Sequence, residues 1–407
     1  MDFSSATVWT DWTKRVQELF LANRVEVDGF RYTRPAPSTY EHQWLWDSCF
    51  HAIAYRWIDP AMARDELLSV VAHQVEAGAD AGMIPHMTYW RGGGEELWGN
   101  AEQSIITQPP LIGVAAWLVF EISHDRELLA SLYPRLCVYH DWFDRRRDPD
   151  QDDLVSIIHP WEAGTDSSPR WDRAMKLPRS FVPAIGTAAR KELAVRVREY
   201  ACDPVALAQA GFFHVETVDY NAIRAADLEA VAKIANELGK SSDSARWSAR
   251  AQAVQSAVQK KLWQPAPHAL EGLAETPIID PSAAEFIALF GGCVSPNDAP
   301  QFIARLRAPE YWTRYPIPTT PTNEPTFAPE QYWRGNTWIA VNWLIYQGLR
   351  RYGYVDLARE LAIKSIELVQ QSGWREYFHP LSGEGLGARS QSWTTLVLDM
   401  FATERQR

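Results

Sequence analysis

The stretch DLEAVAKIANELGKSSDSARWSARAQAVQSAVQKKLW, residues 227–263, indicates the class of fold. Its first part carries an apolar residue at every third or fourth position and stops at Gly239, a residue type that commonly ends helices. The second part, from Ser242 to Trp263, repeats the helical spacing. The two apolar stripes consist of Leu228, Val231, Ile234 and Leu238, and of Trp247, Ala251, Val254, Val258 and Leu262. The stretch therefore predicts two amphipathic helices joined by a short loop.

Helical periodicity recurs along the rest of the chain. Further helices are predicted at residues 10–24, from the mid-forties to about 58, and at 61–78, 104–121, 127–147, 181–200 and 356–373. Long loops with Pro, Trp and acidic residues lie at 264–281, 309–334 and 374–389, and strand-like alternation is scarce. Because no low-complexity linker interrupts the chain, we expect one domain, residues 1–407. The predicted fold is mainly α, and paired helices of this kind can close into a ring with the long loops on one face.

Composition excludes several classes of function. The formal net charge is −11, whereas proteins that bind nucleic acid carry a basic surface, so no nucleic-acid partner is expected. No apolar run approaches the roughly 20 residues of a membrane span, and the first residues lack a signal-peptide pattern. The four cysteines are scattered, and the sequence contains no Cys-x-x-Cys, no P-loop and no Gly-x-Gly-x-x-Gly. We expect a cytoplasmic protein with no membrane partner, no metal ion and no cofactor; a homo-oligomer is left open.

The segment His159-Pro-Trp-Glu-Ala-Gly-Thr-Asp-Ser-Ser-Pro-Arg-Trp-Asp172 is unsuited to a helix, because it contains two prolines, a glycine and a serine pair. It places Glu162 and Asp166 between two of the chain's 19 tryptophans. Aromatic faces suit sugar rings, and a partly desolvated carboxyl can hold a proton near neutral pH. A sugar site is one interpretation of this segment. The alternative is a surface loop whose Asp and Ser cap the next helix.

Aromatic, amide and acidic side chains also crowd the segment Tyr40-Glu-His-Gln-Trp-Leu-Trp-Asp-Ser-Cys-Phe50, at the start of an apolar helix. Asp47 can simply cap that helix, and both tryptophans can belong to the core. However, residues two apart do not share a helix face. At least one of Trp44 and Trp46, together with Gln43 or Asp47, therefore faces something other than the core.

Three stretches far apart in the chain together resemble a known family. They are Gln43-Trp-Leu-Trp-Asp-Ser-Cys-Phe50, Glu162-Ala-Gly-Thr-Asp-Ser-Ser-Pro-Arg-Trp171, and a third that begins at Gln331-Tyr-Trp-Arg-Gly-Asn-Thr-Trp338 and ends with Glu376-Tyr-Phe-His-Pro-Leu-Ser-Gly383 and Ser392-Trp-Thr394. This set resembles glycoside hydrolase family 63, relatives of trehalase and of processing α-glucosidase. The chain is short for that family and looks most like the bacterial mannosylglycerate and glucosylglycerate hydrolases.

The resemblance implies an (α/α)6 barrel and hydrolysis with inversion. The family's general acid is the Asp of the Ser-Pro-Arg-Trp motif, which falls on Asp166. Its general base is the Glu before Tyr-Phe-x-Pro, which falls on Glu376. An inverting glycosidase needs one protonated and one ionised carboxyl with a water beside the base. Taken alone, Glu376 would be interpreted as a solvated loop acid; the joint pattern reverses that interpretation.

By the same resemblance, a further set of side chains would bind the substrate. Asp47 would accept hydrogen bonds from two sugar hydroxyls, and Gly164 would let the backbone approach closely. Gln391 stands where the family commonly has Phe, which suits a small hydrophilic leaving group better than a second stacked sugar. The complete set is Tyr40, Gln43, Trp44, Trp46, Asp47, Tyr89, Gln108, Gly164, Tyr332, Trp333, Arg334 and Gln391.

The leading hypothesis is an inverting hydrolase of glucosylglycerate or mannosylglycerate, a small-molecule sugar substrate. The glycerate carboxylate requires a local cation, for which Arg334 is the first choice and Arg170 and Arg389 the others. A trehalase-like enzyme or a neutral α-glucosidase is the alternative within the family. Outside the hydrolases, the alternatives are a sugar epimerase of the α/α-barrel type, which usually works with histidines, and a catalytically dead sugar-binding module.

Overall fold

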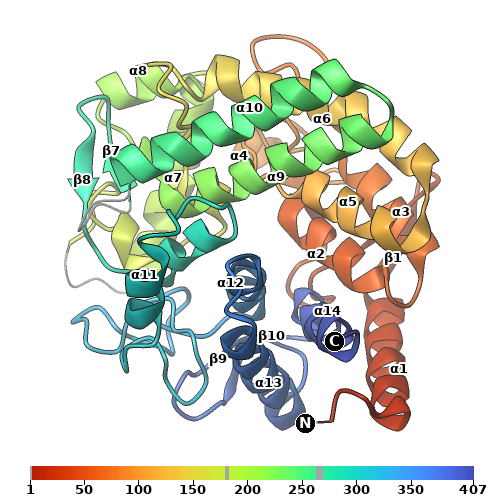
Figure 1. The fold of residues 1–407 in the computed structure, drawn as a ribbon. Helices are drawn as coiled ribbons and strands as arrows, with labels where there is room; N and C mark the ends of the chain where they lie inside the picture. Colours follow the sequence, from red (N-terminus) through yellow and green to blue (C-terminus); the bar gives the residue numbers. More distant parts are fainter. Residues whose placement is uncertain (1, 179–182, 263–268) are drawn as a thin grey trace.

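The computed structural model describes residues 2–178, 183–262 and 269–407. Within these residues, six helical elements form an inner ring, as Figure 1 shows from one side. Each one packs against the next, and the last packs against the first. In order around the ring they are α2 (Leu45–Tyr55), α5 (Ile112–Ser123), α9 (Val218–Glu237), the 3-10 helix η4 (Ala283–Leu289), α12 (Ile339–Arg351) and α14 (Leu396–Arg405).

A second layer of helices surrounds the ring, giving an (α/α)6 barrel. Most outer helices pack on the inner element that precedes them in the chain, and Phe302 of α11 contacts Phe286 of η4. The first helix, α1, packs on the last, α14. The outer helices are α1 (Ala6–Asn23), α3 (Pro60–Val70), α6 (Arg126–Arg146), α10 (Ser241–Ala257), α11 (Ala299–Leu306) and α13 (Val355–Ser372).

Short helices, turns and strands connect the barrel helices. The helices α4 (Glu95–Trp98), α7 (Pro183–Glu199) and α8 (Pro204–Gln209), the 3-10 turns η1 (Pro160–Ala163), η2 (Pro169–Trp171) and η5 (Trp393–Thr395), and the π-helical turn η3 (Val258–Leu262) lie between the barrel helices. Three antiparallel two-stranded sheets pair β1 (Arg24–Val27) with β2 (Phe30–Thr33), β3 (Gln43–Trp44) with β4 (Met87–Thr88), and β9 (Arg375–Phe378) with β10 (Gly385–Arg389). A four-stranded antiparallel sheet has the order β5 (Ser156–Ile157), β6 (Val215–Thr217), β7 (Ala269–Glu271), β8 (Thr276–Ile278).

The burial of each helix follows from its layer. All eleven residues of α2 are buried, and α9 and α12 are buried on nearly every side, as expected for helices enclosed by other helices. The outer helices α1, α10 and α13 bury only one stripe. Local signals mark several outer helix starts, such as Asp59 and Asp125, whose carboxylates accept hydrogen bonds from the first turns of α3 and α6.

The sequence predictions are confirmed for the mainly α class and for most helices, with differences at helix ends. The helix expected at 61–78 ends at Val70, and that expected at 104–121 begins only at Ile112, because Pro109 and Pro110 prevent an earlier start. The helix predicted from residue 227 begins nine residues earlier, at Val218. Its first part is buried but carries polar residues, so the sequence there shows no apolar stripe. Residues 181–182 and 263–268 of the expected elements lie outside the described part of the chain.

Asp399, on α14, joins three elements of the inner ring. Its Oδ1 accepts hydrogen bonds from Arg56 Nη2 at 2.7 Å and from Trp57 Nε1 at 2.7 Å, just beyond α2. Its Oδ2 accepts one from Trp343 Nε1 of α12 at 2.8 Å. Asp399 is completely buried, so these partners replace the water that the carboxylate loses. The last helix is thereby bonded to the two helices on either side of it.

Replacing Asp399 by Ala should lower the free energy of unfolding by about 3–5 kcal/mol, because the buried Arg56 guanidinium loses its hydrogen-bonded carboxylate and keeps only the exposed Glu121, 4.0 Å away. Urea unfolding followed by circular dichroism measures this change. Glu367→Ala, on the exposed face of α13, is the matched control and should alter stability by less than about 0.5 kcal/mol. Equal effects of the two substitutions would contradict a role of Asp399 in closing the ring.

Candidate active site

A cavity opens at one end of the inner ring. Its walls come from segments that immediately precede inner helices: residues before and in the first turn of α2, and residues just before α5, α12 and α14. The acid-containing loop after β5 completes it. The lining residues are Pro35, Tyr40, Trp44, Trp46, Asp47, Gln108, Gly164, Asp166, Tyr332, Glu376, Gln391 and Trp393.

Glu376 is held in this cavity by a hairpin. It lies on β9, and its Oε2 accepts a hydrogen bond from the main-chain N–H of Ala388 on the paired strand β10, at 2.8 Å. Its Oε1 accepts one from the Tyr40 hydroxyl at 2.6 Å. Burial raises the pKa of Glu376, and these two hydrogen bonds oppose that rise because they stabilise the ionised form. Glu376 is thus a fixed carboxylate with two donors.

Asp166 lies opposite, in the loop between η1 and η2. Its pKa is raised to about 6, chiefly by burial, with a further increase from the charge of Glu376. The positive charge of Arg190 acts in the other direction; its Nη1 donates to the main-chain oxygen of Asp166 at 3.3 Å. A carboxyl with this pKa is protonated in about a tenth of the molecules at pH 7, a far larger share than for an ordinary aspartic acid, so it can serve as a general acid near neutral pH.

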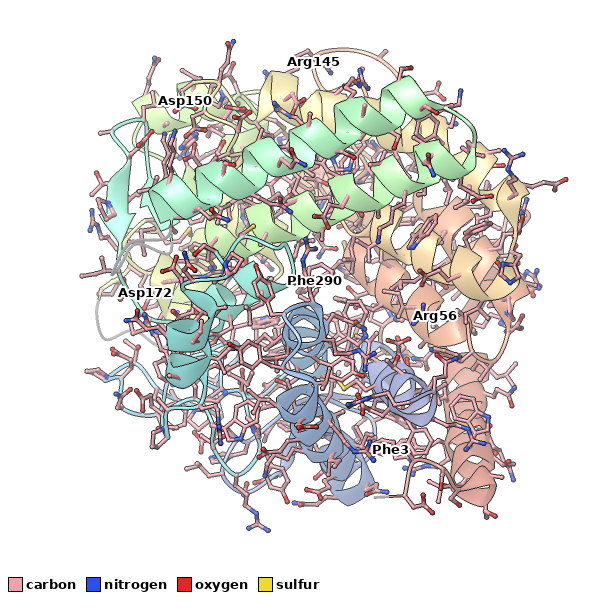
Figure 2. All side chains as sticks on the ribbon, in the orientation of Figure 1. Phe3, Arg56, Arg145, Asp150, Asp172 and Phe290 are labelled. Carbon is pink, nitrogen blue, oxygen red and sulfur yellow. The ribbon has the colours of Figure 1, made fainter. Side chains whose placement is uncertain are left out.

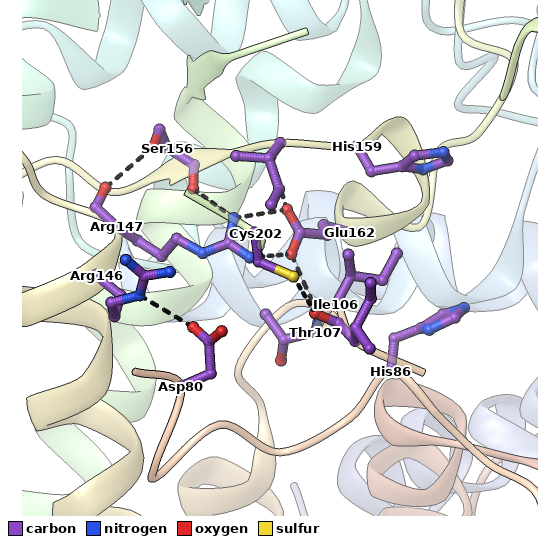
Figure 3. A network of polar contacts seen from close by, with 12 residues as sticks. Asp80, His86, Ile106, Thr107, Arg146, Arg147, Ser156, His159, Glu162 and Cys202 are labelled. Carbon is purple, nitrogen blue, oxygen red and sulfur yellow. Dashed lines mark hydrogen bonds and ion pairs between the residues drawn. The ribbon is translucent and has the colours of Figure 1, made fainter. Parts of the chain in front are cut away.

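A buried ion pair fixes the first half of the acid loop. Both guanidinium ends of Arg147 bond the carboxylate of Glu162, at 2.7 and 3.0 Å, and both side chains are almost completely buried (Figure 3). The same carboxylate accepts hydrogen bonds from the main-chain N–H groups of Ile158 and Thr107. Glu162, the second acid of this segment, therefore holds the loop and does not face the cavity.

Arg170 fixes the second half of the loop. Its guanidinium bonds both carboxylate oxygens of Asp219, at 3.0 and 2.5 Å, and the hydroxyl of Thr165 at 3.0 Å. It also lies 3.9 Å from the centroid of the Trp171 ring. Because Thr165 is the neighbour of Asp166, this contact positions the acid. The Arg170 guanidinium is thus already paired, and the structure does not support it as the cation that binds a substrate carboxylate.

Gly164 meets the indole of Trp46 in the cavity wall. Its φ is +69°, in the left-handed region that favours glycine, and a Cβ there would lie 2.3 Å from the indole ring. The acid loop thus passes directly over the tryptophan. The close approach seen here is to Trp46, and an approach of the Gly164 backbone to a substrate stays a prediction.

Asp47 points into the cavity from the first turn of α2, where the side chain makes no capping bond. The helix begins after Trp44, so the helix-cap interpretation of Asp47 does not fit. Burial raises its pKa well above the usual range, and the nearby charge of Glu376 adds to this. Trp44 and Trp46 both line the cavity as well. The prediction that a tryptophan of this segment faces something besides the core is confirmed.

A second cavity adjoins the first. The two share Tyr40, Trp44, Gln108 and Asp166, so Asp166 lies where they meet. The remaining walls of the second cavity are mostly aromatic or apolar: His86, Met87, Tyr89, Leu97, Trp98 and Trp161. His86 is buried and hydrogen-bonded to Ser104, and burial lowers its pKa to about 3.

Of the predicted catalytic residues and the predicted substrate-binding set, three residues do not line either cavity. The Gln43 side chain is hydrogen-bonded to Ser48, Ser69 and Trp90 and does not line either cavity. Trp333 is buried against Trp338, with ring centroids 3.6 Å apart. Arg334 bonds both oxygens of Asp172, at 3.0 and 2.7 Å.

Sequence analysis missed Pro35, Trp393 and Arg190. Trp393 lay within the motif Ser392-Trp-Thr394, which offered a signal. Arg190, in the middle of α7, offered none. Acidic side chains close enough together to hold a metal ion occur in the described residues at Asp148, Asp150 and Asp152, outside both cavities. No described helix has the length and apolar character needed to cross a membrane.

Comparison with known proteins shows the family of the chain. The sequence profile of the mannosylglycerate hydrolase MGH1-like glycoside hydrolase domain matches residues 40–394. A mannosylglycerate hydrolase of Thermus thermophilus is 32% identical, and the match covers 90% of this chain and 95% of the relative. A glucosylglycerate hydrolase of Mycolicibacterium hassiacum is 28% identical, over 90% of this chain and 93% of the relative.

The crystal structure of a GH63 mannosylglycerate hydrolase from Thermus thermophilus in complex with Tris and D-glycerate has the same fold. Its TM-score is 0.85 at 29% identity, and the match covers 96% of this chain and 100% of that chain. The fold and the site define an (α/α)6-barrel glycoside hydrolase. Within that class, the chain belongs to the mannosylglycerate hydrolase family of GH63.

Gly164→Ala should impair catalysis strongly while the protein still folds, because the added Cβ displaces either Trp46 or the loop that carries Asp166. Gly29→Ala is the matched control: its φ is +81°, so the backbone strain is comparable, but nothing lies within 4 Å of an added Cβ. Measuring kcat/KM and thermal stability for both variants separates the two effects. A similar kcat/KM for the two variants would show that the contact with Trp46 is unimportant.

Proposed function

We propose that the chain hydrolyses the α-glycosidic bond of glucosylglycerate or mannosylglycerate with inversion, Asp166 acting as general acid and Glu376 as general base. One observation supports this most strongly: two carboxyls from distant parts of the chain share one cavity but have different surroundings. Burial raises the pKa of both carboxyls, to about 6 for Asp166, and the two hydrogen bonds that Glu376 accepts oppose this rise by favouring its ionised form. One carboxyl able to accept a proton and one able to donate it are what inversion requires.

The position of Asp166 gives the proposed direction of the substrate. A general acid must reach the oxygen that joins the sugar to its leaving group. Because Asp166 lies where the two cavities meet, the sugar would occupy the cavity that contains Glu376 and Asp47, and the leaving group would point away from Glu376. A water between Glu376 and the anomeric carbon would then attack from the side opposite to the leaving group.

Asp47 is the proposed anchor of the sugar hydroxyls. It is buried, points into the cavity and shares its walls with Trp44 and Trp46. A carboxylate can accept hydrogen bonds from two neighbouring hydroxyls, while the tryptophans cover the apolar face of the ring. Such bonds strengthen as charge develops on the sugar in the transition state, so Asp47 would contribute to rate as well as to binding.

The glycerate carboxylate needs a cation that is not already paired. Arg334 and Arg170 do not meet this need, because each is bonded to two oxygens of a carboxylate, Asp172 and Asp219. Arg190 replaces them in the proposal. It is mostly buried, no carboxylate of the described residues lies within ion-pair distance of it, and it lies near Asp166 and Tyr332.

The relatives support the choice of leaving group. They are named mannosylglycerate and glucosylglycerate hydrolases, and D-glycerate is bound in one of the solved structures. In the present chain Gln391 lines the cavity, and its side-chain oxygen is buried without a hydrogen-bond partner in the described residues. A hydroxyl of a small polar substrate would satisfy it. Incubation with each glycoside, with NMR detection of D-glycerate and of the first sugar anomer formed, tests the proposal; release of an α-anomer first, or no release, would refute it.

The pH dependence should distinguish the two carboxyls. Asp166 donates a proton only while protonated, so kcat/KM should fall as the pH rises through about 6; Glu376 accepts one only while ionised, so kcat/KM should also fall at low pH. Asp166→Asn should reduce turnover of the natural glycosides by about 10²–10⁴-fold and remove the alkaline fall.

A glycosyl fluoride provides the matched comparison, because fluoride leaves without being protonated. Asp166→Asn should retain most activity on this substrate, whereas Glu376→Gln should lose activity on both substrates. If Asp166→Asn lost activity equally on the fluoride, Asp166 would not be the proton donor.

Arg190→Met should raise KM for the glyceryl glycoside by roughly 10- to 150-fold, since a charge-assisted hydrogen bond is worth roughly 1.5–3 kcal/mol. For the uncharged glycerol glycoside the increase should be small. Lys191→Met removes the same charge from the next position of α7, on its exposed side, and should change neither value. An equal loss on the charged and uncharged substrates would instead assign Arg190 to the support of the acid loop.

A further inference from the structure

Gln43, which the sequence predicted to bind substrate, is instead the first member of a buried chain of hydrogen bonds. Its side-chain nitrogen donates to the Ser48 hydroxyl at 3.0 Å, and that hydroxyl donates to Glu66 Oε1 at 2.6 Å. The same carboxylate oxygen lies 3.3 Å from Nδ1 of His51, and the other ring nitrogen of His51, Nε2, lies 2.6 Å from Ser392 Oγ. These five residues form one buried network, which joins α2 and α3 to the segment just before α14.

The buried network has no access to substrate. Its members are at most 1% exposed, and they line neither cavity. The order of groups in Glu66, His51 and Ser392, a carboxylate, an imidazole and a hydroxyl, is that of the hydrolytic triads. A serine nucleophile must meet its substrate, however, and the Ser392 hydroxyl is completely buried. The network can therefore influence hydrolysis only through the residues beside it.

One end of the buried network holds the start of α2, where the proposed sugar anchor lies. Gln43 and Ser48 flank Asp47 in the sequence, and the hydrogen bond between them bridges the turn at which the helix begins. His51 is four residues beyond Asp47, so both lie on the same side of the helix. Arg56, labelled in Figure 2, follows the last residue of α2, and all eleven residues of the helix are buried. A displacement of His51 would therefore move Asp47 with it.

The other end of the buried network holds the support of Glu376. Ser392 is followed by Trp393, a cavity residue whose Nε1 donates to the main-chain oxygen of Glu376 at 3.3 Å. The next residue, Thr394, donates from its hydroxyl to the main-chain oxygen of Arg375 at 2.7 Å. The strand that carries Glu376 thus rests on the residues that follow Ser392.

His51 is the link between these two ends. The main-chain oxygen of Pro35 also binds Ser392, accepting from its N–H at 2.8 Å and lying 2.9 Å from its Oγ, but Pro35 is not part of α2. Among the hydrogen bonds of the described residues, the one between Ser392 and His51 is the only one that joins residues 391–395 to α2. Loss of the imidazole would therefore release this segment from the helix.

We propose that His51 is a positioning residue for the hydrolysis, which fixes the helix start that carries Asp47 relative to the strand that carries Glu376. The inference rests on the roles proposed above for these two carboxyls. A sugar held by Asp47 meets the water beside Glu376 correctly only when the two carboxyls keep their relative positions. A misplacement of about 1 Å can reduce the rate of an enzyme by on the order of 10²-fold.

His51→Gln and His51→Asn form a matched pair for the test, made in the full chain and assayed with the glycoside that it hydrolyses. The amide nitrogen of Gln can take the place of Nε2 and bond Ser392, whereas the shorter Asn can bond only Glu66. The midpoint of thermal unfolding should fall by several degrees in both variants, since each loses one buried hydrogen bond. In contrast, kcat should fall by about 10- to 100-fold in His51→Asn and much less in His51→Gln.

Ser392→Ala removes only a hydroxyl and should reduce kcat as His51→Asn does, because both substitutions break the same contact. His140→Asn is the control for the loss of a buried imidazole. His140 is completely buried, bonds the carboxylate of Asp227 at 3.0 Å and lines neither cavity. This variant should lose thermal stability but keep kcat within about twofold, since effects at distant sites are largely independent.

A crystal structure of Ser392→Ala tests the positions directly. Trp393 and Glu376 should move relative to α2 by about 0.5 Å or more, beyond the tolerance of a well-ordered site. Equal kcat values for His51→Asn and His140→Asn, or an unmoved Glu376 in the crystal, would overturn the inference. If the original chain hydrolysed neither glycoside, the proposed function would fail, and the position of Glu376 in the crystal would still decide whether the contact between His51 and Ser392 positions it.

Discussion

Closure of the inner helical ring is the constraint on which the rest of the molecule depends. The ring is complete only when α14, the last helix, packs between α12 and α2. The completely buried carboxylate of Asp399 bonds to groups from both neighbours, and Arg405 donates hydrogen bonds to the main-chain oxygens of Ser4 and Ser5 near the other terminus. The two ends of the chain are consequently side by side (Figure 1). Without this closure Tyr40 would not reach Glu376, 336 positions away in sequence.

The cavity lies at the end of the ring where several inner helices begin, and this has an electrostatic consequence. Helix N-termini carry partial positive charge, which favours nearby carboxylates. Asp47 is in the first turn of α2, whereas Glu376 lies on strand β9 and not at a helix end. The protein as a whole is acidic, with a net charge of −11, so a negatively charged substrate gains nothing from long-range attraction. Its recognition must come from local groups, of which Arg190 is the one beside the acid.

Buried ion pairs give the site its rigidity. Arg147 with Glu162, and Arg170 with Asp219, each form two hydrogen bonds away from water, one on either side of Asp166. Removing one partner of such a pair leaves a buried charge and is strongly destabilising, so the loop has few alternative conformations. A loop that is fixed in this way can keep Asp166 at the junction of two cavities and partly dry. The raised pKa of Asp166 is thus a consequence of the ion pairs that hold its neighbours in place.

The sequence by itself determined the helical class, most helices and the family, and it singled out the carboxyls that line the cavity, because apolar periodicity and contiguous motifs are local properties of the chain. It located less well the helices enclosed by others: the first part of α9 carries buried polar residues, which remove the apolar stripe that a pattern can detect. Only the tertiary structure decided which charged groups face one another. Glu162, Arg170 and Arg334 look in the sequence like groups available to a substrate, but each has a buried or half-buried partner from a separate segment. Arg190 looks ordinary in the sequence, because its position beside Asp166, without an ion pair to a described carboxylate, arises only when the helices are packed together.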